Sequence, residues 1–95
     1  MFIILLRLTE NRVNAPAHMD GHKAWIKKGL DDGVFLLVGS LQPNAGGAIL
    51  AHNATAEAIR DRVNEDPFVA ENIAAAEILE VSPAMAEQRM QFLLG

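Results

Sequence analysis

Hydrophobic residues along the chain fall into four short groups, and each group predicts a β-strand. Residues 2–8 are almost wholly aliphatic, which is typical of a strand buried on both faces as far as Arg7. Residues 34–38 form a second apolar run between two glycines, and residues 47–52 form a weaker third one. Residues 76–81 alternate in part with glutamates and predict the fourth strand.

Helical periodicity fills the segment between the first two strands. Pro16 suits the first turn of a helix that runs to Asp31 or Asp32, and Gly33 suits the left-handed residue that ends it. The polar residues 9–15 before this helix are expected to form a loop. Spacings of three, four and four place one set of residues on a single helix face, which should pack on the sheet: Met19, His22, Ile26 and Leu30.

Three further helical segments are predicted in the second half of the chain. Thr55 can cap a helix with one apolar side. Asp66 and Pro67 then start a short helical segment, because Asp suits the cap and Pro suits the first helical position. Residues 84–94 predict a last helix, whose apolar side is best explained by packing or by contact with a second copy.

The order of these elements is β-α-β-β-α-β followed by a C-terminal helix. This order predicts a single α+β domain over residues 1–95, with a ferredoxin-like core at about residues 2–83. The fold class is a four-stranded antiparallel sheet with the helices on one face.

Both faces of the predicted sheet are apolar, although helices cover only one of them. Ile3 and Leu5 oppose their equally apolar neighbours in the first strand, and Phe35 and Leu37 do so in the second. A sheet face in contact with water should instead carry polar residues. We therefore expect a homodimer in which a second copy covers the open face, with the C-terminal helix of the same chain as the alternative.

Composition narrows the possible partners. The 95 residues are 51% hydrophobic, carry a net charge of −4 and include no cysteine. The acidic balance argues against nucleic acid and anionic membranes as partners, and the missing cysteines exclude disulfides and thiolate metal sites. No apolar run is long enough to span a membrane, so a cytoplasmic location is expected. The basic residues of the first helix, Lys23, Lys27 and Lys28, are interpreted as a solvated flank.

His22 is the first residue that suggests chemistry, because it interrupts an apolar stripe. A single histidine in such a place is more often a core residue with one hydrogen bond than a catalyst. The alternative is that burial makes its imidazole, whose unperturbed pKa is about 6.5, a usable general acid or base. Asp66 has a similar pair of interpretations, as a helix cap or as the carboxylate that accepts a proton from the His22 ring and orients it.

Other candidate motifs are weaker. His18 lies one helical turn before His22, but no third ligand is evident and no metal is expected, so His18 is interpreted as a rim residue of the site. His52 is expected to end a strand facing solvent. The sequence also lacks a nucleophile elbow, a phosphate-binding loop and the aromatic motif of RNA-binding sheets.

Taken together, several segments resemble the YciI-like (YCII-related) family over about residues 2–83. The resemblance rests on the order and spacing of four groups: Pro16-Ala17-His18 with His22 to Ile26, Gly33 to Gly39, Gly46 to Leu50, and Asp66-Pro67-Phe68-Val69. It implies a dimeric α+β barrel and an active site in which His22 and Asp66 form a pair. Most members have no assigned reaction, the fold is similar to that of muconolactone isomerases, and at least one relative is a dehalogenating enzyme of aromatic breakdown. Members usually have Gly-Pro where this chain has Gly39-Ser40.

Two functions follow as hypotheses. The first is a cofactor-free lyase or isomerase, in which His22 moves a proton on a small anionic or carbonyl-bearing molecule and Asp66 orients it. Ser40, Arg7 and Arg12 are candidate donors to such a substrate, and the expected apolar walls are Trp25, Phe35 and Phe68. The second is a non-catalytic dimeric module that binds a small molecule or a protein partner. The first requires the His22 ring to lie within reach of the Asp66 carboxylate, beside a cavity.

Overall fold

The computed structural model describes all 95 residues and contains the predicted order of strands and helices. Its elements, in chain order, are β1 (Phe2–Leu8), the 3₁₀ helix η1 (Glu10–Asn14), α1 (Ala15–Asp31), β2 (Phe35–Leu41), β3 (Gly46–Ala51), α2 (Ala56–Asn64), α3 (Pro67–Ala70), β4 (Ala74–Glu80) and the 3₁₀ helix η2 (Gln88–Leu94). Residues 9–15, expected as a loop, therefore contain η1 and the start of α1.

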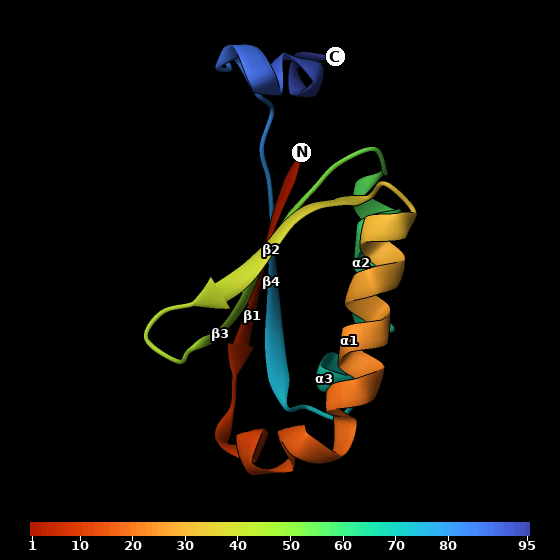
Figure 1. Ribbon diagram of the computed structural model, residues 1–95, viewed down its shortest axis with the longest axis vertical. Helices are drawn as coiled ribbons and strands as arrows, with labels where there is room; N and C mark the ends of the chain where they lie inside the picture. The colour runs from red at the N-terminus through yellow and green to blue at the C-terminus, as the bar shows by residue number, and fades with distance from the viewer.

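The four strands form one antiparallel sheet in the order β2-β3-β1-β4. The helices α1, α2 and α3 all lie on the same face of this sheet (Figure 1). This arrangement confirms the predicted ferredoxin-like α+β fold. No helix in the structure has both the length and the apolar character needed to cross a membrane.

The core lies between the sheet and these helices, and β1 runs through its centre. Alternate residues of β1 face the helices and are buried, namely Phe2, Ile4 and Leu6. Ile59 and Val63 of α2 pack against the same region and are also fully buried. The period of two along β1 and the period of three to four along α2 thus produce the two halves of one core.

The helix α1 contacts the sheet along a different line from the predicted one. Its buried residues are Trp25 and Gly29, whereas Leu30 of the predicted stripe is exposed. The cause is a close approach of β2, since a Cβ atom on Gly29 would lie 2.1 Å from Cδ2 of Phe35. The missing side chain lets the Phe35 ring occupy that space. Within the predicted stripe, Met19 and Ile26 are partly buried and pack against the core, so Leu30 is the member that is turned away from it.

An irregularity in β2 places two of its residues on opposite faces of the sheet, where one shared face was expected. The register shifts between Phe35 and Leu37, so one residue of β2 has no partner on β3. Phe35 is 3% exposed and faces the helices, while Leu37 is 65% exposed and faces the opposite side. These two residues were expected on the same face, but a bulge changes the alternation of side chains.

The face of the sheet opposite the helices is uncovered and mostly apolar, with one ion pair between Arg7 and Glu77. Ile3 and Leu5 alternate with the buried residues of β1, and Leu37 and Leu79 are exposed on the two edge strands, β2 and β4. The predicted C-terminal helix does not cover them. Residues 81–87 have no regular structure, and η2 lies beyond the end of the sheet (Figure 1). In this structure, therefore, no helix of the same chain covers the open face.

The C-terminal segment extends the molecule to 41 Å in its longest dimension. It has no buried residue, and Met85 and Phe92 are among its exposed side chains. Phe92 contacts the chain through His52, whose ring lies 5.6 Å away in an edge-to-face arrangement. His52 thus follows β3 as expected, but it touches an aromatic ring as well as solvent.

Candidate functional site

The sequence placed His22 and Asp66 on separate elements, and the fold brings their side chains together. The Nδ1 atom of His22 lies 2.7 Å from Oδ1 of Asp66. The Asp66 side chain is completely buried, and the His22 side chain is 14% exposed. A buried carboxylate beside a nearly buried imidazole is an arrangement found at catalytic histidines, although it also occurs in structural pairs.

A glycine in α1 permits this contact. The helix α3, which begins just after Asp66, crosses α1 next to Gly21, and a Cβ atom there would lie 3.1 Å from Cγ of Pro67. A glycine inside a helix costs about 1 kcal/mol relative to alanine, so its presence needs a local reason. Here the close approach of Pro67 supplies that reason and places Asp66 against the neighbouring residue, His22.

One oxygen of Asp66 holds both the helix and the histidine. The backbone N–H of Phe68 donates to Oδ1 at 3.1 Å, which caps α3, and Nδ1 of His22 donates to the same atom. Because a carboxylate only accepts hydrogen bonds, the shared proton belongs to Nδ1 of the ring. The opposite nitrogen, Nε2, is then free to accept a proton. The second oxygen, Oδ2, is buried without a hydrogen-bond partner.

Aromatic rings hold the imidazole on its faces. The ring of Phe68 lies parallel to that of His22, with an interplanar angle of 3° and a centroid separation of 4.0 Å. The ring of Trp25 lies 6.0 Å away at 25°. The hydrogen bond to Asp66 and these two contacts restrict rotation of the His22 side chain, so that its position is fixed before any ligand binds.

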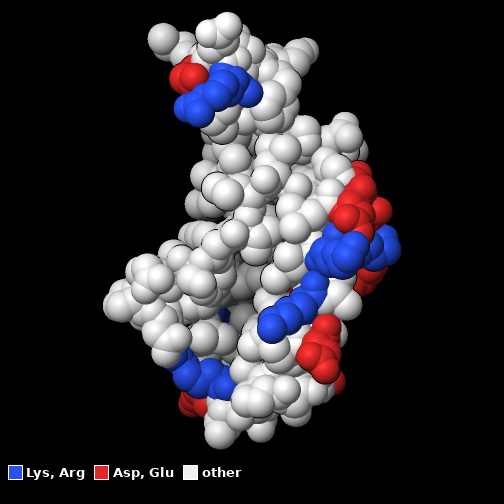
Figure 2. Space-filling model, viewed as in Figure 1, with Lys and Arg blue, Asp and Glu red and all other residues white.

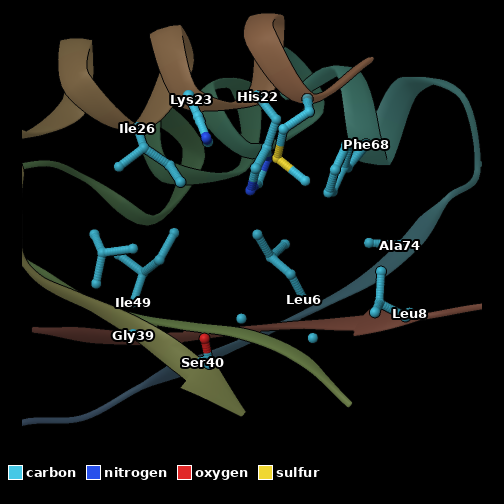
Figure 3. A pocket seen from close by; sticks show the side chains of 14 residues that line it. Leu6, Leu8, His22, Lys23, Ile26, Gly39, Ser40, Ile49, Phe68 and Ala74 are labelled. Carbon is cyan, nitrogen blue, oxygen red and sulfur yellow. The ribbon is translucent and has the colours of Figure 1, made fainter. Parts of the chain in front are cut away.

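A pocket with a volume of about 420 Å³ lies between α1 and the sheet, directly beside His22. In Figure 3 a nitrogen at the tip of the His22 ring points into this space, toward the strands. Most of the wall is apolar and comes from both layers, including Leu6, Leu8, Met19, Ile26, Val38, Ile49, Phe68 and Ala74. The polar side chains at the pocket are those of His22, Lys23 and Ser40. Figure 2 shows the corresponding hollow between an uncharged surface on the sheet side and charged side chains on the helix side.

Three predicted site residues line this pocket, and Asp66 lies behind one of them. His22 and Phe68 form the helical wall, while Ser40 faces them from the sheet. The stripe Met19, His22 and Ile26, expected to pack on the sheet, forms part of the same wall.

The two predicted arginines do not line the pocket. Arg7 lies on the exposed, opposite face of the sheet, where its Nη1 atom donates to Oε1 of Glu77 at 2.8 Å. Arg12 lies in η1 and donates to the backbone oxygens of Asn44 and Thr9. Side chains alternate between the two faces along β1, and Leu6 faces the helices, so the next residue, Arg7, points away from the pocket.

The remaining predicted residues lie behind or beside the pocket. The ring of Trp25 packs at 5.0 Å on Phe35, and its Nε1 atom donates to the backbone oxygen of Arg62 at 2.9 Å. These residues support α1 rather than contact a ligand. His18 is partly buried and lies outside the pocket wall. No three His, Cys, Asp or Glu side chains gather closely enough to hold a metal ion.

Lys23 and Gly47 belong to the pocket but were not predicted. Lys23 lies four residues after Met19 and three before Ile26, so helical spacing alone places it at the edge of the same wall. Gly47 pairs with the inward-facing Leu6 and Ser40, and a Cβ atom there would meet only the Gly39 oxygen, at 3.6 Å. The missing side chain at Gly47 therefore leaves room in the pocket floor.

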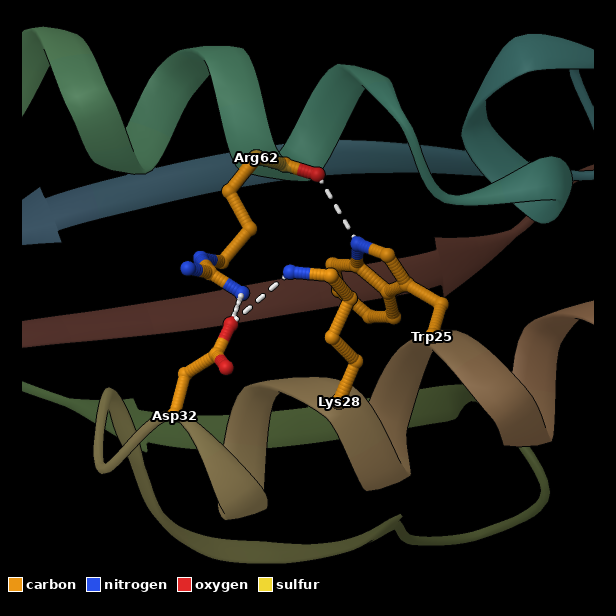
Figure 4. Close-up of polar contacts among 4 residues, drawn as sticks. All are labelled: Trp25, Lys28, Asp32 and Arg62. Atoms are coloured by element: carbon orange, nitrogen blue, oxygen red, sulfur yellow. Dashed lines mark hydrogen bonds and ion pairs between the residues drawn. The ribbon is translucent and has the colours of Figure 1, made fainter.

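A second polar cluster joins the C-terminal end of α1 to α2. Asp32 Oδ2 accepts from Lys28 Nζ at 2.9 Å and from Arg62 Nη1 at 3.1 Å (Figure 4). The hydrogen bonds from Lys28 and Arg62 lower the pKa of Asp32 below its ordinary value of 3.8. This cluster lies on the surface and does not line the pocket beside His22.

Comparison with known proteins identifies the fold but not a family. The 5-chloro-2-hydroxyhydroquinone dehydrochlorinase TftG from Burkholderia phenoliruptrix AC1100, solved in complex with 2,5-dihydroxybenzoquinone, is similar with a TM-score of 0.68. The match has 12% sequence identity and covers 85% of this chain and 93% of that one. No family model and no curated protein sequence match the chain. At this identity the similarity shows a shared fold.

Proposed function

We propose that the protein is a small enzyme that moves a proton on a compact oxygenated molecule bound between α1 and the sheet. One observation carries this proposal. The Nδ1 atom of the His22 ring lies 2.7 Å from Asp66, while the opposite edge of the same ring faces the pocket. His22 is the general acid and base. Asp66 is a positioning residue that holds the ring in the Nδ1–H tautomer and stabilises the imidazolium.

The dimensions of the pocket support a small, partly apolar substrate. A volume of about 420 Å³ lies within the range of small-molecule sites, and the apolar wall limits water around the imidazole. Ser40 lies on the strand side, so its hydroxyl can donate to a substrate oxygen while Nε2 of His22 works from the helix side. The ligand of the structurally similar TftG, 2,5-dihydroxybenzoquinone, has this character and is a suitable probe.

Proton transfer to this probe can be followed without knowledge of the natural substrate. In D₂O the imidazolium of His22 delivers a deuteron from Nε2 to a ring C–H carbon, and a C–D bond forms. The neutral imidazole then removes the proton from the same carbon, and the ring regains its conjugation without a change in oxidation state. The loss of the ring C–H signal in proton NMR therefore measures the reaction directly.

We expect wild-type protein to accelerate this exchange over the protein-free solution. His22→Asn should remove the acceleration, because an amide can still donate to Asp66 but cannot exchange a proton with the ring. Asp32→Asn is the matched control, since it alters the other polar cluster of α1 and should leave the exchange unchanged. Equal exchange in wild type and His22→Asn would contradict the proposal. It would favour a role in which His22 only packs.

We further propose that two copies pack with their open sheet faces together. The support for this arrangement is the uncovered apolar surface that includes Leu37 and Leu79, which a monomer would leave in water. Light scattering should give twice the chain mass of 10.3 kDa at micromolar concentration. Leu37→Glu should yield monomer, while Leu30→Glu, an equivalent change at an exposed position of α1, should not. A monomeric wild type would exclude this assembly.

The same features support membership of the YciI-like family as a proposal. The ferredoxin-like fold and the pairing of His22 with Asp66 are the properties that the sequence resemblance implied. Ser40, in the place where members usually have proline, lines the pocket and adds a hydroxyl to it. We expect this difference to alter the choice of substrate rather than the step at His22.

A further inference from the structure

Three lysines lie along the exposed side of α1, and only one of them lacks an acidic partner. Lys27 Nζ contacts Asp31 Oδ2 at 2.6 Å, and Lys28 Nζ contacts Asp32 Oδ2 at 2.9 Å. Lys23 forms no ion pair or side-chain hydrogen bond in the structure. The two paired lysines have their carboxylates at i+4, whereas the residue at i+4 from Lys23 is Lys27, which carries the same charge.

The unpaired lysine is also the one that reaches the pocket. Lys23 belongs to the wall, and in Figure 3 its side chain descends from α1 beside His22 and Ile26 toward the same space. No Asp or Glu lines the pocket, because the Asp66 carboxylate is fully buried behind the His22 ring. The pocket thus presents a cation and no facing anion, in a chain whose net charge is −4.

We propose that Lys23 selects an anionic substrate for the pocket beside His22. The substrate class is a small planar molecule with at least one ionised oxygen, such as an enolate, a phenolate or a carboxylate. Its charge meets the Lys23 ammonium at the open side, and its apolar part lies on Leu6 and Ile49 of the sheet. This inference rests on the proposed function, since it assigns the ligand of the same site.

The geometry gives Lys23 and His22 separate tasks. Lys23 is exposed on the mouth side, so it attracts an anion through water and loses little hydration when it binds. His22 is nearly buried and presents one nitrogen edge. A bound anion that touches both is placed with its charged oxygen outward and its reacting carbon near Nε2. Lys23 is therefore a specificity residue for binding, not a group that moves the proton.

Two ring compounds separate charge from shape. The first is 2,5-dihydroxybenzoquinone, which is ionised at neutral pH, and the second is its neutral dimethyl ether, 2,5-dimethoxybenzoquinone. Calorimetric titration should show tighter binding of the ionised ring to wild type, with an affinity that falls as sodium chloride is added. Lys23→Met should weaken binding of the ionised ring by about fivefold and leave the neutral ring unchanged. Lys23→Arg should restore the preference.

The control is Lys27→Met, which removes the same charge one turn further along α1 but outside the pocket wall. It should leave both affinities unchanged. If Lys23→Met and Lys27→Met weaken the ionised ring equally, or if wild type binds the two rings with equal affinity, the inference about Lys23 is overturned. The deuterium exchange by His22 is measured independently at saturating probe. If wild type exchanges the deuteron but does not prefer the ionised ring, only the role of Lys23 is contradicted. If wild type prefers the ionised ring but does not accelerate the exchange, only the proposed proton transfer by His22 is contradicted.

Discussion

Asp32 and Asp66 connect α1 to the second half of the chain in two different ways. Asp32 accepts hydrogen bonds from Lys28 and Arg62 at the surface, and all the charged groups remain in contact with water. Asp66 accepts from His22 and from the backbone of Phe68 in a fully buried position, and its second oxygen has no partner. The surface contact joins helices, whereas the buried contact fixes an imidazole beside a cavity.

The difference shows that a carboxylate acquires a chemical use through its surroundings. Surface ion pairs contribute little to folding because water screens them and competes for the same groups. A buried carboxylate is costly unless its partners compensate for the lost hydration. The chain retains that cost at Asp66, next to the one histidine that faces the pocket, while it keeps every other acidic side chain at least partly exposed.

The largest expected difference between the two carboxylates is kinetic. His22→Asn should lower the deuterium exchange of the probe by about 10² to 10⁴, the range contributed by general acid–base groups. The free energy of unfolding should change much less, because the side chain is at the edge of the core. A matching loss of activity in Asp32→Asn would break the comparison, since it would show that both clusters act alike.

A second expected difference is in stability. Asp66→Ala removes the cap of α3 and leaves Nδ1 of His22 without an acceptor, so urea denaturation should show a loss of about 2 kcal/mol. Asp66→Asn keeps the cap and should recover much of that loss while the exchange stays impaired. Asp32→Ala should produce a far smaller change in the same assay. A reversed order of the two alanine variants would contradict the account of buried and exposed pairs.

Filling the pocket tests whether the space beside Asp66 is used. Gly47→Val adds a side chain toward the pocket at a strand position where the first added carbon meets no close neighbour. We expect at least about a tenfold loss of probe affinity, which corresponds to about 1.4 kcal/mol, with folding retained. Calorimetric titration measures the affinity and circular dichroism checks the fold. Unchanged affinity in a folded variant would place the ligand elsewhere.

The smallest expected effect concerns the pH dependence at Asp32. Its pKa is lower in the folded chain than its ordinary value of 3.8, so the folded state favours the ionised form. The resulting stabilisation is present above pH 3.8 and is lost as the pH falls through the lower, folded pKa. The melting temperature of Asp32→Asn should thus lie slightly below that of wild type at pH 6, and the gap should close as the pH falls through the folded pKa of Asp32. Asp31→Asn, which alters a pair within α1 alone, serves as the control.

The sequence predicts the fold well because hydrophobic spacing is a local property. The period of two along β1, the helical spacing of α1 and α2 and the cap at Asp66 each depend on nearby residues. The order of these elements then admits the ferredoxin-like sheet. The C-terminal prediction was only partly right, because residues 88–94 form a 3₁₀ helix without a buried residue, in contact with the chain through the rings of Phe92 and His52. A helix depends on tertiary contacts for most of its stability.

The site is only partly predictable, because it depends on distances between elements. His22 and Asp66 stand out by residue type, but nothing local shows that their side chains meet. The arginines were assigned by charge, whereas the alternation of β1 turns Arg7 away from the pocket. The informative signals were two glycines within a helix, Gly21 and Gly29, which mark the places where Pro67 and Phe35 approach α1.

The central claim, that Asp66 prepares the His22 ring for proton transfer, is tested most directly by the tautomer of that ring. Long-range ¹H–¹⁵N correlation NMR on labelled protein, at a pH where the ring is neutral, distinguishes the nitrogen that carries the proton. The account predicts a protonated Nδ1 and a bare Nε2 in wild type, with the Nε2 signal shifting when 2,5-dihydroxybenzoquinone is added. A ring that carries its proton on Nε2, or an Nε2 signal that does not respond to the probe, would contradict the account.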